Sequence, residues 1–148
     1  MSRFKRILHP SDFSRASGRA FAKAVELAKD NRADLLLIHV FTLPMQMVGE
    51  AYIPTAAYEG LEASMRAAAT KHLDKLIARA KRAGVPARGL VLEGIPDDRI
   101  TRAARSNRTD LIVMGTHGRT GLAKLFLGSV VARILASAAC PVMTVRGT

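Results

Sequence analysis

The segment GTHGRTGLAKLFLGSVV, residues 115–131, is unusually rich in glycine for a stretch that runs into an apolar helical pattern. Its glycines are Gly115, Gly118, Gly121 and Gly128. Glycine allows backbone angles that turn amide N–H groups inward, and the free N–H groups at a helix start favour phosphate. Arg119 and Lys124 add positive charge to the same segment. The spacing predicts a phosphate-binding loop, and the alternative is a glycine turn followed by a serine N-cap at Ser129.

This spacing differs from two common phosphate loops. A Walker loop requires G-x-x-x-x-G-K-[ST], and the sequence contains no such string. The Rossmann fingerprint G-x-G-x-x-G belongs to the first strand–helix turn, whereas G-x-x-G-x-x-G occurs here after the fourth apolar run. The pattern therefore excludes both of those loops.

Length and composition predict one domain, residues 1–148. The chain carries 23 Lys and Arg against 12 Asp and Glu, a formal net charge of +11, and such an excess attracts anions. Its one cysteine, Cys140, cannot form a disulfide framework or a zinc cluster, and we expect it to be a small buried apolar residue. No apolar run is long enough for a membrane span or a signal peptide, so we expect a cytoplasmic protein.

Short apolar runs alternate with helical patterns along the chain. The runs that predict strands are 6–10, 35–41, 87–94, 110–115 and 141–146. The helical patterns cover 14–29, 59–82, 96–107 and a segment that begins at 128. Residues 42–58 contain two prolines and no clean period, and we interpret them as a loop. This alternation predicts an α/β domain with a parallel sheet and helices on both faces.

Three of the helical patterns have apolar residues at the spacing of one helix face. These residues are Phe21, Ala24, Val25 and Ala28 in the first, Leu73, Leu76, Ile77 and Ala80 in the second, and Val131, Ile134, Leu135 and Ala138 in the last. We expect each set to pack on the sheet.

The glycine segment also resembles a known family. DLIVMGTHGRTGLAKLFLGSVV, followed by CPVMTVR, is similar to the C-terminal half of universal stress proteins, and RILHPSDFSRASGRAFAKAVELA and LLLIHV resemble their first strand, helix and second strand. The ATP-binding members carry Gly-x2-Gly-x9-Gly-[Ser/Thr], which Gly115, Gly118, Gly128 and Ser129 match without a gap. The resemblance implies a Rossmann-like open sheet of five parallel strands in the order 3-2-1-4-5. Such a sheet binds ligands where the order reverses, here between the first and fourth strands.

The resemblance also implies a nucleotide site. Its residues would be Pro10, Ser11, Asp12, Val40, Met114, Gly115, His117, Gly118, Arg119, Gly128, Ser129 and Val130. Asp12 would accept hydrogen bonds from ribose hydroxyls or help to hold Mg²⁺ or Mn²⁺, or would instead cap the first helix. Val40 would contact adenine through its backbone. Arg119 would either bind phosphate or face water.

The histidines carry no predicted catalytic role. His117 lies in the glycine loop, but a general base must lie within hydrogen-bond reach of the attacking water, which the sequence does not show. We interpret His9 and His39 as core or rim residues of strands, and His72 as a helix residue without a partner pattern. His9 departs from the family, which commonly has an apolar residue there.

Together these features predict an ATP-binding universal stress protein that acts as a nucleotide-dependent stress-response regulator, with at most slow hydrolysis. The family often forms homodimers through its last strand, here 141–146. One alternative is an ATP-hydrolysing enzyme, and another is a binding module whose basic surface attracts nucleic acid or an acidic protein. Residues 42–60 would either close over the nucleotide or merely connect two elements.

Overall fold

The computed structural model describes residues 3–43, 55–116 and 128–147. Its strands are β1 (Arg6–Pro10), β2 (Asp34–Phe41), β3 (Ala87–Glu93), β4 (Leu111–Gly115) and β5 (Val142–Val145). Its helices are α1 (Arg15–Asn31), α3 (Thr55–Arg82), α4 (Pro96–Ser106) and α5 (Ser129–Ser137). The alternation of strands and helices that the sequence predicts is confirmed. None of these helices is both long and apolar enough to cross a membrane.

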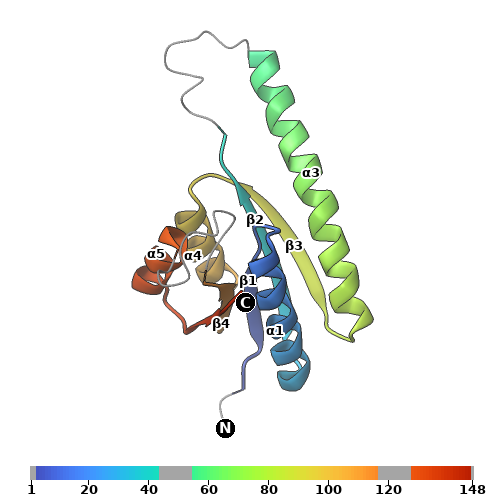
Figure 1. The fold of residues 1–148 in the computed structure, drawn as a ribbon, viewed down its shortest axis with the longest axis vertical. Coiled ribbons are helices and arrows are strands. Elements are labelled where there is room, and N and C mark those ends of the chain that lie inside the picture. The colour runs from blue at the N-terminus through green and yellow to red at the C-terminus, as the bar shows by residue number, and fades with distance from the viewer. Residues whose placement is uncertain (1–2, 44–54, 117–127, 148) are drawn as a thin grey trace.

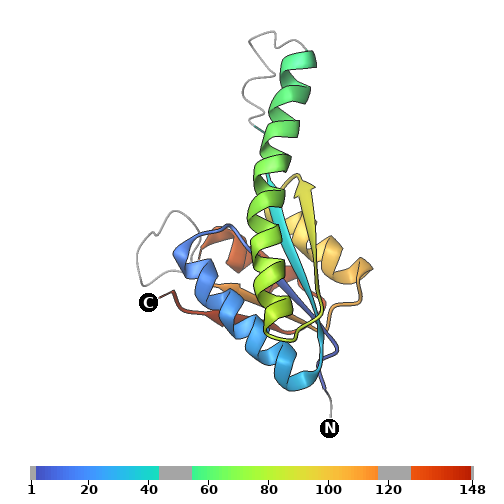
Figure 2. The same ribbon diagram turned by 90° about the vertical axis from the view of Figure 1, so that its right-hand side faces the viewer.

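The five strands form one parallel sheet in the order β3-β2-β1-β4-β5, as predicted. Helices α1 and α3 cover one face, and α4 and α5 cover the other (Figures 1 and 2). Successive strand residues point to opposite faces, so Ile7 packs under α1 while Leu8 packs under α4 and α5. Because both faces are covered, β2 and β4 carry continuous apolar runs rather than alternating ones.

The helices bury most of the apolar faces predicted for them. Phe21, Ala24 and Ala28 of α1 are buried, and so are Leu73 and Ala80 of α3. Together they form one apolar layer against the sheet. Helix α1 begins where the Ser14 hydroxyl accepts a hydrogen bond from the Ser17 amide at 3.1 Å, an N-cap that satisfies a free helix donor.

Two details of the helix prediction are wrong. Helix α3 begins at Thr55, four residues before the predicted start at 59. Ala56 and Ala57 favour a helix but are exposed, so this turn has no apolar stripe for periodicity to detect. Leu135, predicted to pack on the sheet, is 44% exposed, because α5 buries only Val131 and Ile134.

The hydrogen-bond ladder between β1 and β4 ends early, and the sequence explains why. The paired residues are Ile7 with Leu111 and Leu8 with Ile112. The Ser11 amide binds the Ile38 carbonyl of β2 at 2.8 Å, and bonding sides alternate along a strand, so the nitrogen of Pro10 faces β4. A prolyl nitrogen has no hydrogen to donate. Beyond Leu8 the two strands are therefore not held together by backbone bonds.

The side chain of His9 forms a hydrogen bond with β4 where the nitrogen of Pro10 cannot. Its Nδ1 donates to the Val113 carbonyl at 2.9 Å, and its side chain is completely buried beside Phe21. Nε2 has no hydrogen-bond partner among the described residues. Burial lowers the pKa of His9 from 6.5 to about 4, and the bond to Val113 and the charge of Asp12 offset part of that shift. The predicted core position of His9 is confirmed.

The lowered pKa of His9 makes stability depend on pH. The neutral ring contributes fully above the ordinary pKa of 6.5, and this contribution is lost as the pH falls towards the folded-state pKa of about 4, because the unfolded chain binds the proton more readily. We expect His9→Val to remove about 3 kcal/mol of the fall in the free energy of unfolding between pH 7 and pH 4. Urea denaturation of both proteins at several pH values measures the difference. If the free energy of unfolding changes equally with pH in both proteins, His9 is not a buried neutral ring.

Candidate functional site

A cavity of about 290 Å³ lies at the carboxyl edge of the sheet, where β1 and β4 separate. The ends of β1, β2 and β4 form its floor, and the first turns of α1, α4 and α5 surround it. Its lining residues are Pro10, Ser11, Asp12, Ser17, Ile38, Val40, Pro96, Ile100, Met114, Gly115, Gly128, Ser129, Val130 and Val131. The cavity thus occupies the point where the strand order reverses, which is the usual ligand site of open α/β sheets.

The structure brings the predicted nucleotide-binding residues together. Those that it describes all line this cavity: Pro10, Ser11, Asp12, Val40, Met114, Gly115, Gly128, Ser129 and Val130. The others, His117, Gly118 and Arg119, lie outside the described residues. Segments more than 100 residues apart in the sequence therefore meet at one cavity.

Part of the lining comes from residues that the sequence did not predict for the site. Ile38 lies two residues before Val40 on β2, so the two side chains share a sheet face, and strand periodicity could have identified it. Pro96 and Ile100 come from the first turns of α4, and Val131 comes from α5. An apolar helix residue that lines a cavity carries the same sequence signal as one in the core. Only the packed structure distinguishes them.

The loop between β1 and α1 forms a hydrogen-bonded polar corner of the cavity. The buried Ser11 hydroxyl accepts from the Ser17 hydroxyl at 3.0 Å and from the Phe13 amide at 3.1 Å. Asp12 Oδ1 accepts from the Ser14 amide at 2.9 Å. Since Ser14 is the N-cap of α1, the alternative role of Asp12 as that cap is wrong. Asp12 instead lines the cavity.

The N-terminus of α5 forms the opposite side of the cavity. Gly128 is the N-cap and makes no side-chain capping bond, while Ser129 is the first helical residue. The alternative of a serine N-cap at Ser129 is therefore wrong, since the cap position falls one residue earlier. The first N–H groups of a helix have no partner within it, and here they lie at a cavity. Such a helix start attracts anions.

Phe13 has a strained backbone beside this cavity. Its φ is +63°, a left-handed conformation that is uncommon for a bulky residue. Its ring stacks on His39 at a centroid distance of 4.4 Å and on His72 at 4.8 Å. The strain costs about 1–2 kcal/mol, and each aromatic stack contributes about 0.5–1.5 kcal/mol. The two stacks are thus of the right size to offset the strain.

The two histidines come from different elements. His39 lies on β2, and its Nδ1 donates to the Ser11 carbonyl at 2.8 Å, which confirms its position at the rim. His72 lies on the exposed side of α3, and the sequence shows no partner pattern for it. Because Phe13 and His72 are distant in sequence, no local pattern reveals their contact.

The cavity contains few groups that could hold a metal. Asp12 is the one carboxylate in the described lining. No group of three or more His, Cys, Asp or Glu is placed to hold a metal ion in the ranges 3–43, 55–116 and 128–147. One carboxylate with a nucleotide's phosphates is nevertheless a common arrangement for Mg²⁺. The donor set therefore fits a cation that enters with its nucleotide.

The buried hydrogen bond between Ser17 and Ser11 gives a test of the polar corner. Ser17→Ala removes the donor to the Ser11 hydroxyl and should lower the free energy of unfolding by about 1 kcal/mol. Ser137→Ala is the matched control, because the Ser137 hydroxyl bonds its own helix in an exposed position. We expect the control to stay within about 0.5 kcal/mol of the original protein in urea denaturation. If both variants lose the same free energy of unfolding, the buried hydrogen bond contributes no more to stability than the exposed one.

The chain matches the model of the universal stress protein family over residues 3–146. It is 35% identical to universal stress protein MJ0531 of Methanocaldococcus jannaschii, over 97% of this chain and 82% of that protein. It is 37% identical to a universal stress protein of Thermus aquaticus encoded in the 3′ region of a QAH/OAS sulfhydrylase gene, over 97% of this chain and 99% of that protein.

Solved structures share the fold. The structure of MJ0577, a universal stress protein of Methanocaldococcus jannaschii, has a TM-score of 0.85 at 24% identity and covers 98% of this chain and 97% of its own. A universal stress protein in complex with cAMP has a TM-score of 0.73 at 23% identity, with 99% and 100% coverage. A family member from Arabidopsis thaliana with AMP bound has a TM-score of 0.67 at 22% identity, with 96% and 91% coverage.

Proposed function

Since the chain belongs to the universal stress protein family, we propose that it binds an adenine nucleotide, ATP above all, in the cavity between β1 and β4. The observation that carries the proposal is the meeting of Asp12, Gly115 and the start of α5 at that one cavity. Two family members of the same fold, one in complex with cAMP and one with AMP, support it.

The lining suggests how the nucleotide lies. Ile38, Val40 and Ile100 form an apolar side that suits a base, since aromatic rings bind well against aliphatic side chains. Asp12 then accepts hydrogen bonds from the ribose hydroxyls, as a carboxylate does readily. The phosphates lie at the N-terminus of α5, against the amides of Ser129 and Val130, where the helix dipole favours negative charge.

This arrangement binds phosphate but does little to cleave it. In the alternative role of Asp12, the carboxylate would instead hold a bound Mg²⁺ or Mn²⁺, which would neutralise phosphate charge. Hydrolysis also requires a base within reach of the attacking water, and we assign none. We therefore propose a nucleotide-dependent stress-response regulator with at most slow hydrolysis, formed by a single domain over residues 1–148 and located in the cytoplasm. Turnover above about 1 per second would instead indicate an enzyme.

A charge placed at the start of α5 tests the phosphate position. Ser129→Asp should weaken the affinity for ATP with Mg²⁺ about tenfold, because its carboxylate repels phosphate. The same carboxylate complements the helix dipole, so the free energy of unfolding should stay unchanged or rise by about 0.5 kcal/mol. Calorimetric titration measures the first quantity and urea denaturation the second.

Ser129→Asn is the matched control, since it has a similar shape without the charge. We expect its affinity for ATP to lie within about threefold of the original protein's. If both variants bind ATP as the original protein does, the phosphates do not lie at α5. Titrations with AMP and cAMP show which nucleotide binds best.

We also propose a homodimer through the last strand. In the order β3-β2-β1-β4-β5, strand β5 is an edge, and an exposed edge strand can pair with a second copy. Met143 on this strand and Leu135 on α5 are large apolar residues with 36% and 44% of their surface exposed. Pairing two β5 edges would cover part of this apolar surface.

Met143→Asp should shift this dimer to monomer, because it places two carboxylates in the paired edges. Light scattering after gel filtration measures the mass. Leu61→Asp is the control, since Leu61 is exposed to a similar degree, 38%, but lies on α3. A dimer that persists in Met143→Asp, or that dissociates equally in Leu61→Asp, would contradict the β5 interface.

The net charge of +11 supports a second candidate function, the binding of nucleic acid or an acidic protein. Exposed cations are dense on α1 and the C-terminal half of α3: Arg15, Arg19, Lys29, Lys71, Lys75, Arg79, Lys81 and Arg82. Binding of this kind weakens steeply as salt is raised. It would also survive Ser129→Asp, which distinguishes it from nucleotide binding in the cavity.

A further inference from the structure

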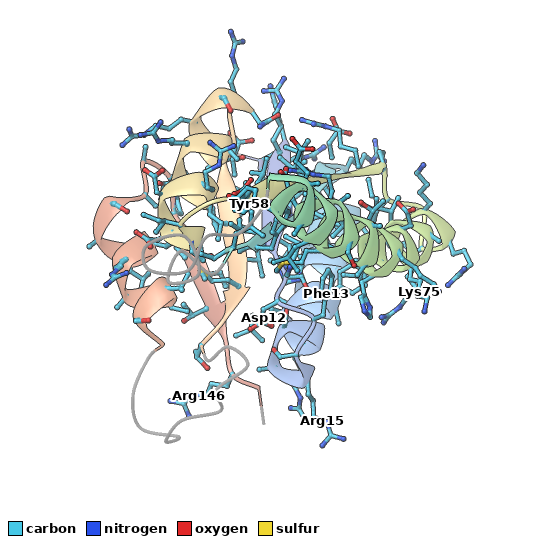
Figure 3. The ribbon with its side chains drawn as sticks, turned by 90° about the horizontal axis from the view of Figure 1, so that it is seen from above. Asp12, Phe13, Arg15, Tyr58, Lys75 and Arg146 are labelled. Carbon is cyan, nitrogen blue, oxygen red and sulfur yellow. The ribbon has the colours of Figure 1, made fainter. Side chains whose placement is uncertain are left out.

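Phe13 is a neighbour of the candidate site rather than a part of its lining. It follows Asp12, which lines the cavity, in the loop between β1 and α1. In Figure 3 its side chain lies towards α3, while Asp12 lies on the other side of the loop. A strained residue of this kind persists only where its surroundings hold it.

The surroundings of Phe13 hold it from two sides. The ring lies nearly parallel to the rings of His39 and His72, with interplanar angles of 22° and 27°. His39 belongs to the sheet, and His72 belongs to α3. His39 also donates a hydrogen bond to the Ser11 carbonyl, so it binds the loop through both a ring contact and the backbone. The loop is therefore attached both to the sheet and to α3.

The backbone at Phe13 in turn orients the polar corner of the cavity. The Phe13 amide donates to the Ser11 hydroxyl at 3.1 Å, and the next amide, that of Ser14, donates to Asp12 Oδ1 at 2.9 Å. A rotation of Phe13 out of its left-handed conformation would move these amides relative to one another. The side chains of Ser11 and Asp12 would then lose the donors that fix them.

We propose that Phe13 is a positioning residue of the nucleotide site, whose ring, stacked between His39 and His72, holds the loop so that Ser11 and Asp12 face the cavity. This inference rests on the proposed function, because it assigns to the stack a contribution to nucleotide affinity. It also gives His72 of α3 a part in nucleotide binding, although the described residues of α3 do not line the cavity. Nucleotide binding and the packing of His72 on the loop then stabilise each other.

The test compares Phe13→Gly with Phe13→Tyr. Glycine adopts a positive φ freely, so Phe13→Gly keeps the loop conformation accessible but removes the ring that selects it. We expect the dissociation constant for ATP with Mg²⁺ to rise about tenfold, because the loop is then in its binding conformation for only part of the time. Phe13→Tyr restores a ring that can stack and should bind within about twofold of the original protein.

Two further variants separate the stack from general effects. His72→Ala removes one of the stacked rings at an exposed position, and we expect a smaller rise in the dissociation constant, about threefold. Tyr58→Ala removes an aromatic ring of α3 whose hydroxyl bonds Glu93 instead, and should leave ATP affinity unchanged. Urea denaturation of each variant confirms that the fold is intact.

The outcomes distinguish this inference from the proposed function. If Phe13→Gly binds ATP as tightly as the original protein, or if Phe13→Tyr fails to restore binding, the positioning role is wrong. If the original protein binds none of ATP, AMP and cAMP, the proposed function fails instead. Hydrogen exchange of the Phe13 and Ser14 amides then decides whether the ring holds the loop. We expect exchange about tenfold faster in Phe13→Gly, and equal exchange would overturn the inference.

Discussion

The end of the β1–β4 ladder at Pro10 is the constraint on which the candidate site depends. Parallel strands that bond along their whole length leave no space between them, and here backbone bonding between the two stops after Leu8. From β1 the chain winds to β2 and β3 on one side, and from β4 it continues to β5 on the other. The crossover helices leave in opposite directions, so the space above the separation is bounded by α1 on one side and by α4 and α5 on the other. His9 limits how far the strands separate, because its ring still bonds Val113 across the gap.

Several departures from ideal local structure lie near this cavity. Phe13 has a positive φ, His9 is a buried histidine with one unpartnered nitrogen, and Ser11 and Ser17 are buried hydroxyls. Elsewhere the buried residues are mostly Ile, Leu, Val and Ala in two apolar layers. A protein that tolerates unfavourable local features at one place commonly uses them for function. The stacked rings, the hydroxyl pair and the bond to Val113 show how each feature here is stabilised.

Among the described residues, the excess of positive charge and the cavity are separate features. The described lining contains no lysine or arginine, and the groups in it that favour an anion are the amides at the start of α5. The ion pairs among the described residues, such as Lys23 with Glu26 and Arg102 with Asp98, lie largely in solvent, where they contribute little to stability. Net charge therefore bears on which partners approach the surface, and the geometry of the cavity bears on which ligand it selects.

The sequence by itself determined the order of the elements and the parallel sheet, because these depend on local periodicity and on the rules of α/β topology. The strand order, and with it the meeting of the Asp12 and Gly115 loops, was implied by the resemblance to the family. The sequence also indicated the start of α5, although the cap fell on Gly128 rather than Ser129. Only the tertiary structure decided that Pro96 and Ile100 line a cavity, that Leu135 is exposed, and that His72 meets Phe13. An apolar side chain has the same periodicity in a core, in a cavity wall or at an open surface. What distinguishes these places is the packing of elements that are distant in the chain, and no local pattern contains it.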